Sequence, residues 1–183
     1  MLRIIIILLL FLAPITALSK VGFVDFTDLL DDSDLVIYGT ATGAFYNDDG
    51  SGYGLVRVKK VMFGNTQEQV VKIFWTSDRY EAKISKLLSE YVFFLKKTKD
   101  GYTGSSLERS QWEVIPIYKK TATGYIEMVD GGVVLPFAVN NIPPELFARK
   151  IDLDCSVYND CERERITIWK LSSYLNKASL KRK

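Results

Sequence analysis

Two acidic stretches contain the residue types in this sequence that could do chemistry. Asp31-Asp32-Ser33-Asp34 places three carboxylates within four residues, and residues 47–51 read Asn-Asp-Asp-Gly-Ser. Clustered carboxylates can hold a hard cation or act as a general acid and base. A metal site would need more oxygen ligands from elsewhere in the chain, and a hydrolase would need a partner acid or base. Sequence spacing supplies neither of them.

Both stretches also fit connections between elements. Short polar residues at 31–34 suit a tight link from a helix to a strand, and we interpret them as a solvated connection. Residues 47–51 lack the spacing and the closing glutamate of an EF-hand, and their composition is typical of a hairpin loop. We therefore predict no metal ligand and no cofactor.

The composition argues against an enzyme. The chain contains no histidine, which excludes histidine-dependent catalysis. Serine can use lysine as its base, and Ser85-Lys86 and Ser19-Lys20 are adjacent pairs. Adjacency in sequence does not place the two groups together in space, so no catalytic residue is assigned. A hydrolase that acts through carboxylates stays open as an alternative.

The two cysteines, Cys155 and Cys161, are separated by five residues. This spacing does not match a C-x-x-C redox motif, and without histidine there is no ligand set to complete a zinc site. In an oxidising compartment two thiols this close usually pair. We predict a structural disulfide that adds about 2–3 kcal/mol by constraining the unfolded chain.

The N-terminus has the pattern of a secretory signal peptide. Arg3 precedes an uninterrupted apolar run at residues 4–12, and the small residues Ala17 and Ser19 suit a cut before Lys20. The run is well short of the roughly 20 residues that span a bilayer. We therefore expect residues 1–19 to be removed and the protein to be periplasmic or extracellular, without a stable membrane anchor.

Charge gives no reason to expect a nucleic-acid partner. Removal of residues 1–19 takes away Arg3, one of 24 cations, and none of the 22 acids, which leaves a formal charge of +1. The basic end at residues 177–183 has no interleaved aromatic residues on which bases could stack. The 164 residues that remain of 183 are enough for one domain. We expect a barrel at 20–118 and an extension at 119–183 packed on it.

Hydrophobic periodicity places the elements of the barrel. Apolar residues at spacings of three and four predict a helix between residues 20 and 32. Alternating or β-branched runs predict five strands, at residues 35–46, 55–63, 69–75, 91–97 and 112–118. A phase change at Lys60 indicates a β-bulge, and Gly39 and Gly43 indicate bends or close backbone contacts in the first strand. Tyr80, Ile84, Leu87 and Leu88 repeat as in a helix after the third strand.

The remaining chain predicts a smaller set of elements. A hairpin is expected from strands at 124–129 and 133–137 with its turn at Asp130-Gly131-Gly132. A short strand at 165–169 and a helix from 171 to 177 follow. The fold class is therefore mainly β: an OB-like five-stranded barrel with a helix between strands three and four, plus a C-terminal hairpin and helix. We predict one barrel core formed by Val56, Val58, Ile73, Trp75, Phe93 and Leu95.

Three segments resemble a known group of domains. SDLVIYGTATG (33–43), GLVRVKKVMFGN (54–65) and EYVFFLKKTKDGYT (90–103) look like exported bacterial domains that are similar to the inhibitory domain of the tissue inhibitors of metalloproteinases. The resemblance implies an OB-type barrel and covers under half of the chain. In the animal inhibitors a cysteine at the mature N-terminus chelates the protease zinc, but here no cysteine precedes Cys155. That mechanism is therefore not transferred.

Three functions follow as alternatives. The first is a secreted, non-enzymatic interaction module, inhibitor-like, that presents strand faces and the loops at 47–54 and 98–110 to an unidentified protein partner. An exposed apolar patch on the barrel would favour it. The second is a hydrolase of envelope polymers, which needs two acids about 5–10 Å apart in a cleft. The third is a carbohydrate- or ligand-binding OB domain, which needs aromatic rings along one groove.

Overall fold

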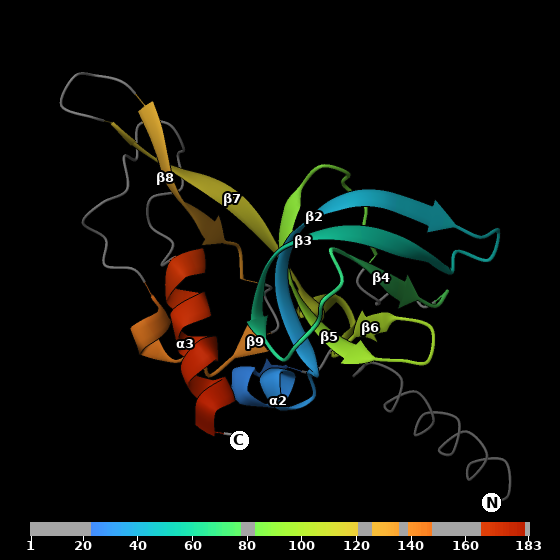
Figure 1. Ribbon diagram of the computed structural model, residues 1–183, viewed down its shortest axis with the longest axis horizontal. Coiled ribbons are helices and arrows are strands. Elements are labelled where there is room, and N and C mark those ends of the chain that lie inside the picture. The colour runs from blue at the N-terminus through green and yellow to red at the C-terminus, as the bar shows by residue number, and fades with distance from the viewer. Residues whose placement is uncertain (1–22, 78–82, 121–125, 136–138, 148–165, 182–183) are drawn as a thin grey trace, which may run out of the picture.

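The computed structural model describes residues 23–77, 83–120, 126–135, 139–147 and 166–181. The protein is mainly β, with a barrel on one side and a long hairpin and a C-terminal helix on the other (Figure 1). The longer elements are α2 (Phe26–Asp31), β2 (Leu35–Tyr46), β3 (Gly52–Phe63), β4 (Val70–Trp75), β5 (Glu90–Lys97), β7 (Gln111–Lys120), β8 (Ile126–Val133) and α3 (Ile168–Lys181). The short ones are β1 (Val24–Asp25), β6 (Tyr102–Gly104), η2 (Leu107–Ser110), β9 (Val139–Asn140), η3 (Pro144–Leu146) and β10 (Ile166–Thr167).

Five strands close the barrel in the order β2-β3-β4-β6-β5. The pairs β2–β3, β3–β4, β5–β6 and β2–β5 are antiparallel, and β4–β6 is parallel, so the barrel is mixed. Closure leaves no open edge along these five strands where they pair. The bends expected in the first strand are present, because the β2–β3 register shifts beside Gly39 and Gly43. The bulge is confirmed as well, since Lys59 is the extra residue between Lys60 and Val58.

The strand that closes the barrel is not the one that the sequence predicts. Residues 112–118 belong to β7, which pairs with β5 outside the barrel and with β8. Closure is made by β6, in a segment for which the sequence predicts no strand. Its Tyr102 pairs with Ile73 of β4, and its Gly104 with Leu95 of β5. A strand of three residues is too short to show alternation, which is why periodicity missed it.

The expected helix between the third and fourth strands is absent from residues 83–89, the part of this connection that the structure describes. Ile84 is buried, but Leu87 and Leu88 are 54% and 80% exposed, so the supposed apolar stripe does not face one core. The backbone follows β2 instead, because the Leu88 N–H donates to the Ala41 carbonyl at 2.8 Å. Tertiary hydrogen bonds therefore replace the helical ones.

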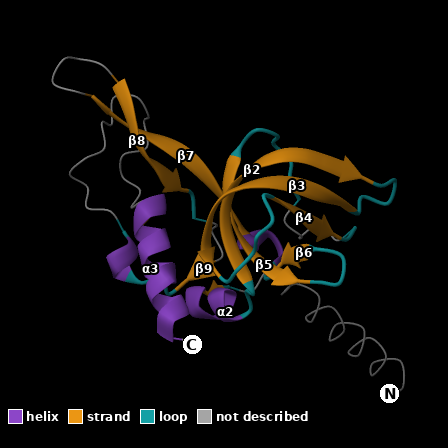
Figure 2. Ribbon diagram, in the orientation of Figure 1, coloured by secondary structure: helices purple, strands orange, loops and turns teal. Residues whose placement is uncertain are grey.

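The predicted turn at Asp130-Gly131-Gly132 is also wrong, because these residues lie inside β8 and pair with residues 115–117 of β7. A Cβ on Gly131 would lie 2.6 Å from Val114 Cγ1 and 3.1 Å from Ile168 Cγ1. The glycine thus permits close packing and does not turn the chain. Figure 2 shows the resulting β7–β8 hairpin extending beyond the barrel. The short strand and the helix that follow are confirmed as β10 and α3.

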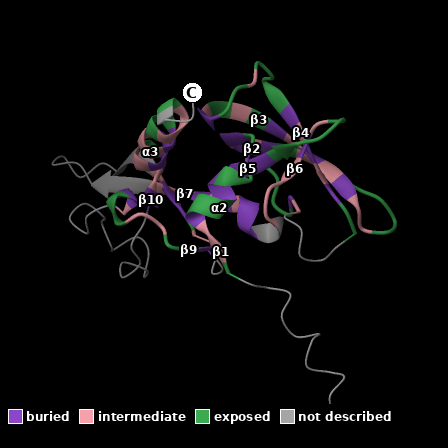
Figure 3. Cartoon of the chain, turned by 90° about the horizontal axis from the view of Figure 1, so that it is seen from below, coloured by how far each residue is buried: buried purple, intermediate pink, exposed green. Residues whose placement is uncertain are grey.

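Two hydrophobic clusters share the β2–β5 sheet. The inner cluster fills the barrel and contains five of the six predicted core residues, Val56, Ile73, Trp75, Phe93 and Leu95, with Val58 packed partly buried against it. The outer cluster lies between the sheet and α2, β7, β8 and α3, and its members include Phe26, Phe94, Trp112, Leu146, Ile166 and Leu171. β5 contributes to both clusters. Its residues 91–95 are all buried, because each of its two faces packs on one of them (Figure 3).

Within the described residues, no helix has both the length and the apolar character that crossing a membrane requires.

Candidate interaction surface on the barrel

The acidic stretch at 31–34 joins three elements through its polar side chains. Ser33 Oγ donates to the Leu29 carbonyl at 2.7 Å and lies 3.0 Å from Ser105 Oγ. Asp34 Oδ2 accepts a hydrogen bond from the Lys97 N–H at 2.8 Å. These contacts tie the end of α2 to the β2–β5 edge of the barrel. Among the described residues, no group of three or more His, Cys, Asp or Glu side chains is placed to hold a metal ion.

The second acidic stretch, residues 47–51, forms the tip of the β2–β3 hairpin. The Asn47 N–H donates to the Ser51 carbonyl and the Ser51 N–H donates to Asp49 Oδ1, both at 2.8 Å. Gly50 has φ +80°, a conformation that favours glycine in such a turn. The hydrogen bonds from the Ser51 side chain and backbone lower the pKa of Asp49 below its usual 3.8. The loop is therefore an acidic, exposed turn.

Behind this tip, the outer sides of β2, β3 and β4 form one continuous surface. We call it the outer face and define it by three cross-strand rows: Phe45–Tyr53–Phe74, Gly43–Leu55–Lys72 and Thr40–Arg57–Val70. The alternate residues of these strands point into the barrel. Every member of the outer face is exposed or half-buried, with Phe45 at 48% and Val70 at 46%. An apolar surface of this kind at a sheet face calls for an explanation.

The first row is an aromatic ladder across three strands. The rings of Phe45 and Tyr53 stack with centroids 4.6 Å apart and planes 20° apart, and Tyr53 and Phe74 lie at 5.9 Å. Lys72 Nζ lies 3.8 Å from the Tyr53 centroid and 4.6 Å from that of Phe74, which are cation–π distances. The faces of Tyr53 are thus already occupied.

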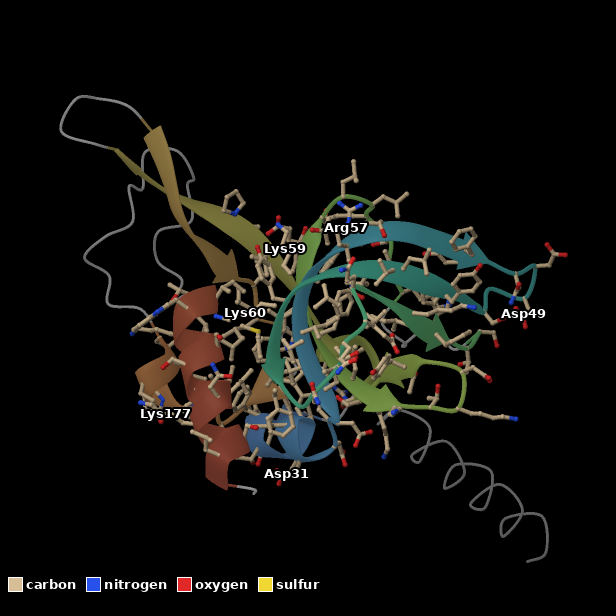
Figure 4. The ribbon with its side chains drawn as sticks, in the orientation of Figure 1. Asp31, Asp49, Arg57, Lys59, Lys60 and Lys177 are labelled. Atoms are coloured by element: carbon tan, nitrogen blue, oxygen red, sulfur yellow. The ribbon has the colours of Figure 1, made fainter. Side chains whose placement is uncertain are left out.

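The charge of the outer face is one-sided. Lys72 and Arg57 are its charged members, and neither has a carboxylate within 4 Å among the described residues. Figure 4 shows Arg57 on β3 and Asp49 far from it at the hairpin tip. The turn between β5 and β6 borders the same face, because a Cβ on Gly101 would lie 3.1 Å from Phe74 Cε2. The face is therefore apolar, carries two cations, and is flanked by the β2–β3 and β5–β6 loops.

A polar cluster lies next to this face on β2, β3 and β5. Glu90 accepts a hydrogen bond from Tyr38 and forms an ion pair with Lys59. Burial raises the pKa of Glu90, but the hydrogen bonds from Lys59 and Tyr38 and the Lys59 charge outweigh it and lower that pKa below 4.5. Because all members are paired, the cluster holds strands together and offers no free acid or base.

A concave surface lies elsewhere on the molecule, between η3 and α3. It has a volume of about 550 Å³, and its lining includes Leu146, Trp169 and Tyr174 with Glu145, Lys170 and Lys177. Trp169 is 68% exposed, and Lys170 Nζ donates to the Phe147 carbonyl at 2.5 Å. Glu145 is the one carboxylate among the lining residues that the structure describes. A pair of acids for glycoside or polymer hydrolysis is not assembled there.

Sequence reasoning did not identify the outer face, although its members were visible. Tyr53 and Leu55 occupy the strand phase opposite to Gly54 and Val56, and Val70 and Phe74 occupy the phase opposite to Val71, Ile73 and Trp75. Aromatic residues in strands usually pack in a core, so their presence alone does not indicate a surface. Two strands with apolar residues on both phases indicate that a second apolar surface exists. The structure shows which of the two phases faces solvent. The adjacent Ser85 and Lys86 lie within the described residues, where Lys86 Nζ forms an ion pair with Glu113 Oε1 at 2.9 Å.

The remaining predicted features, the signal peptide at 1–19, Ser19 and the Cys155–Cys161 bridge, lie outside the described residues. Comparison of the sequence with protein-family models gives no match, and comparison with curated proteins gives no relative.

Proposed function

We propose that this chain is an exported, non-enzymatic protein-interaction module that binds a protein partner through the outer face. The observation that carries the proposal is the aromatic ladder on the outside of the barrel, in which Phe45 is exposed and Tyr53 and Phe74 are half-buried, although the barrel has a core without them. Soluble proteins seldom keep a contiguous apolar surface that has no use. Aromatic residues and arginine are also the types enriched at protein interfaces.

The strand order supports the OB-type part of this proposal. In OB barrels the first three strands form a meander, the third pairs with the fifth in parallel, and ligands bind on the outside of strands two and three between two loops. Here β3 and β4 take those positions, and the loops at residues 47–51 and 98–101 flank them. The resemblance to the metalloproteinase inhibitors implies the same type of barrel, but their zinc-chelating cysteine has no counterpart before Cys155.

The geometry favours a protein over a carbohydrate. Sugar recognition by aromatic residues uses an open ring face, whereas Tyr53 is stacked on one side by Phe45 and approached by the Lys72 ammonium. A stacking ligand would have to displace one of these contacts first. A protein side chain can instead pack against the ring edges and against Leu55 and Val70 without disrupting the ladder.

Affinity capture with the chain exported from its own cell tests the proposal. The bait is the wild type or Phe45→Glu, and captured proteins are quantified by mass spectrometry. A charge at the centre of an apolar contact typically weakens binding by about 2 kcal/mol or more, so the partner should be depleted at least about tenfold with Phe45→Glu. The melting temperature of the Phe45→Glu variant should stay close to that of the wild type, because Phe45 is outside both cores.

Trp169→Glu is the matched control, since Trp169 is another exposed aromatic residue, at the η3–α3 cleft. It should capture the partner as well as the wild type does. A partner that is lost with Trp169→Glu and kept with Phe45→Glu would place binding at the cleft and overturn the proposal.

A further inference from the structure

We propose that this chain also binds an anionic lipid surface, on which α3 lies with its helix axis parallel to the membrane. This inference goes beyond the proposed function, because it uses a surface made by α3 and not the outer face. It starts from the exposed side of α3, where a tryptophan, a leucine and a lysine lie in solvent.

The described side chains of α3 that are exposed all lie on one side of the helix. We call them the exposed face of α3: Trp169, Asn176, Lys177 and Leu180. At about 100° per residue they fall within a sector of about 100°, and Trp169 and Leu180 are about 20° apart. The buried Leu171 and Leu175 lie about 200° and 240° round from Trp169 and belong to the outer cluster. The exposed face is therefore opposite to the side by which α3 packs.

The spacing of the two apolar residues favours a lipid surface over a protein. Trp169 is 68% exposed and Leu180 is 74% exposed. They lie about 17 Å apart along the helix axis, with the polar Asn176 between them. A protein hot spot is a compact cluster that neighbouring contacts shield from water. An interfacial helix requires that its apolar side chains lie along one line, as these do.

The charge of this region complements anionic lipid headgroups. Residues 166–183 contain five Lys or Arg and no Asp or Glu, although the whole chain has 24 basic and 22 acidic residues. Lys177 is exposed and has no carboxylate within 4 Å among the described residues, and it lies on the side of α3 away from the barrel (Figure 4). Glu145 is the one described carboxylate that lines the neighbouring cleft. Tryptophan and lysine are residue types that place an apolar body at the headgroup level and a polar group in water.

The small number of contacts predicts reversible binding that depends on salt. Two apolar side chains enter the lipid, and the basic segment adds an attraction that ions screen. An increase in salt from about 0.1 M to about 1 M shortens the screening length from about 10 Å to about 3 Å. Most of the bound protein should therefore be released.

Sedimentation with vesicles tests the inference on the full chain as its cell matures it. Vesicles of phosphatidylcholine alone are compared with vesicles in which about one lipid in three is phosphatidylglycerol. The anionic vesicles should bind the protein at least about tenfold more tightly at about 0.1 M salt. Trp169→Ala and Lys177→Glu should each weaken this binding at least about fivefold.

The matched controls lie on the barrel, away from α3 (Figure 1). Phe45→Ala removes an exposed aromatic ring, and Lys99→Glu reverses an exposed charge in the turn between β5 and β6. Both should bind anionic vesicles within about twofold of the wild type, because charges beyond a screening length from the membrane contribute little. Thermal melts show whether every variant is folded.

The emission of Trp169 gives a second readout of the same surface. In a variant with phenylalanine at positions 75 and 112, Trp169 is the one tryptophan that remains. Its emission should shift to shorter wavelength when anionic vesicles are added, because the indole leaves water.

A wild type that does not bind anionic vesicles at about 0.1 M salt overturns the inference. Equal losses with Lys99→Glu and Lys177→Glu also overturn it, because net charge would then explain the binding. Bound protein whose Trp169 emission does not shift would show that the exposed face of α3 stays in water, with the same consequence. If vesicles are not bound and Trp169→Glu loses a captured protein, that face is a protein interface and the lipid inference falls.

Discussion

Trp75 is a single residue on which the packing of the barrel core depends. Its side chain is 4% exposed, and Cβ atoms on Gly52 and Gly54 would lie 3.1 and 3.2 Å from its indole ring. The two glycines of β3 therefore leave the space that the indole fills. The exposed ring of Tyr46 covers it, with centroids 5.2 Å apart. Stability at this end of the barrel therefore depends on the large indole of Trp75 and on the absence of a side chain at Gly52 and Gly54.

We expect Trp75→Ala to lower the free energy of unfolding by about 3–5 kcal/mol, the usual cost of truncating a buried tryptophan. The measurement is chemical denaturation followed by circular dichroism. Trp169→Ala is the control and should change stability by no more than about 0.5 kcal/mol, because Trp169 is mostly exposed. Equal effects of the two changes would contradict the assignment of Trp75 to the barrel core.

Glu90 makes a pH-dependent contribution at the same scale. Its pKa in the folded protein lies below 4.5, because Lys59 and Tyr38 stabilise the carboxylate more than burial disfavours it. A lowered pKa adds stability above the unfolded value, and this stability is lost as the pH falls through the folded value. Glu90→Gln should thus cost about 0.5–1 kcal/mol at pH 7 and progressively less below about pH 4.5.

Stability measured at several pH values checks this expectation, with Tyr38→Phe as a second probe of the cluster. A difference between the wild type and Glu90→Gln that grows as the solution is acidified would have the wrong sign and would refute the role given to Lys59.

Among the elements, the connection from β4 to β5 differs most from its predicted form. Leu88 has φ +64° and is 80% exposed, so a bulky side chain occupies a left-handed conformation without burial in return. Such strain in a non-glycine residue costs of the order of 1 kcal/mol or more. It persists because the Leu88 N–H is held by the Ala41 carbonyl.

Leu88→Asn should therefore stabilise the protein by about 0.5–1 kcal/mol, since asparagine tolerates positive φ better than leucine does. Leu87→Asn, at an exposed neighbouring position with negative φ, should show no such gain. Thermal melts of the two variants measure the difference. A loss of stability in Leu88→Asn alone would mean that the leucine side chain makes a contact of value.

For the molecule as a whole, the two cores share strands. Phe93 and Leu95 of β5 face the inner cluster while Val92 and Phe94 face the outer one, so neither core can be lost without disturbing the same strand. This arrangement predicts one cooperative unfolding unit for the barrel and the β7, β8 and α3 layer.

Tryptophan fluorescence can report each core separately. Trp75 belongs to the inner cluster and Trp112 to the outer one, whereas Trp169 is exposed. In variants that keep one buried tryptophan and carry phenylalanine at the other two positions, the fluorescence midpoint should coincide with the circular dichroism midpoint of the same variant. Separate midpoints would show that the barrel and the outer layer unfold as independent units.

Sequence alone determined the features that depend on neighbours along the chain. Alternation located β2, β3, β4 and β5, a phase change at Lys60 indicated the bulge that the structure has at Lys59, and the helical period located α3. Five of six predicted residues share the inner core, because a strand's two phases sort by polarity wherever one face is buried.

Tertiary structure decided what depends on contacts between distant segments. A three-residue strand, β6, closes the barrel because β4 and β5 both offer it hydrogen bonds. Gly131 permits packing of α3, and Phe45, Tyr53 and Phe74 face solvent because the other phase of their strands fills the core. Local pattern records which residues are apolar, but which apolar phase is buried is fixed by the elements that pack against it.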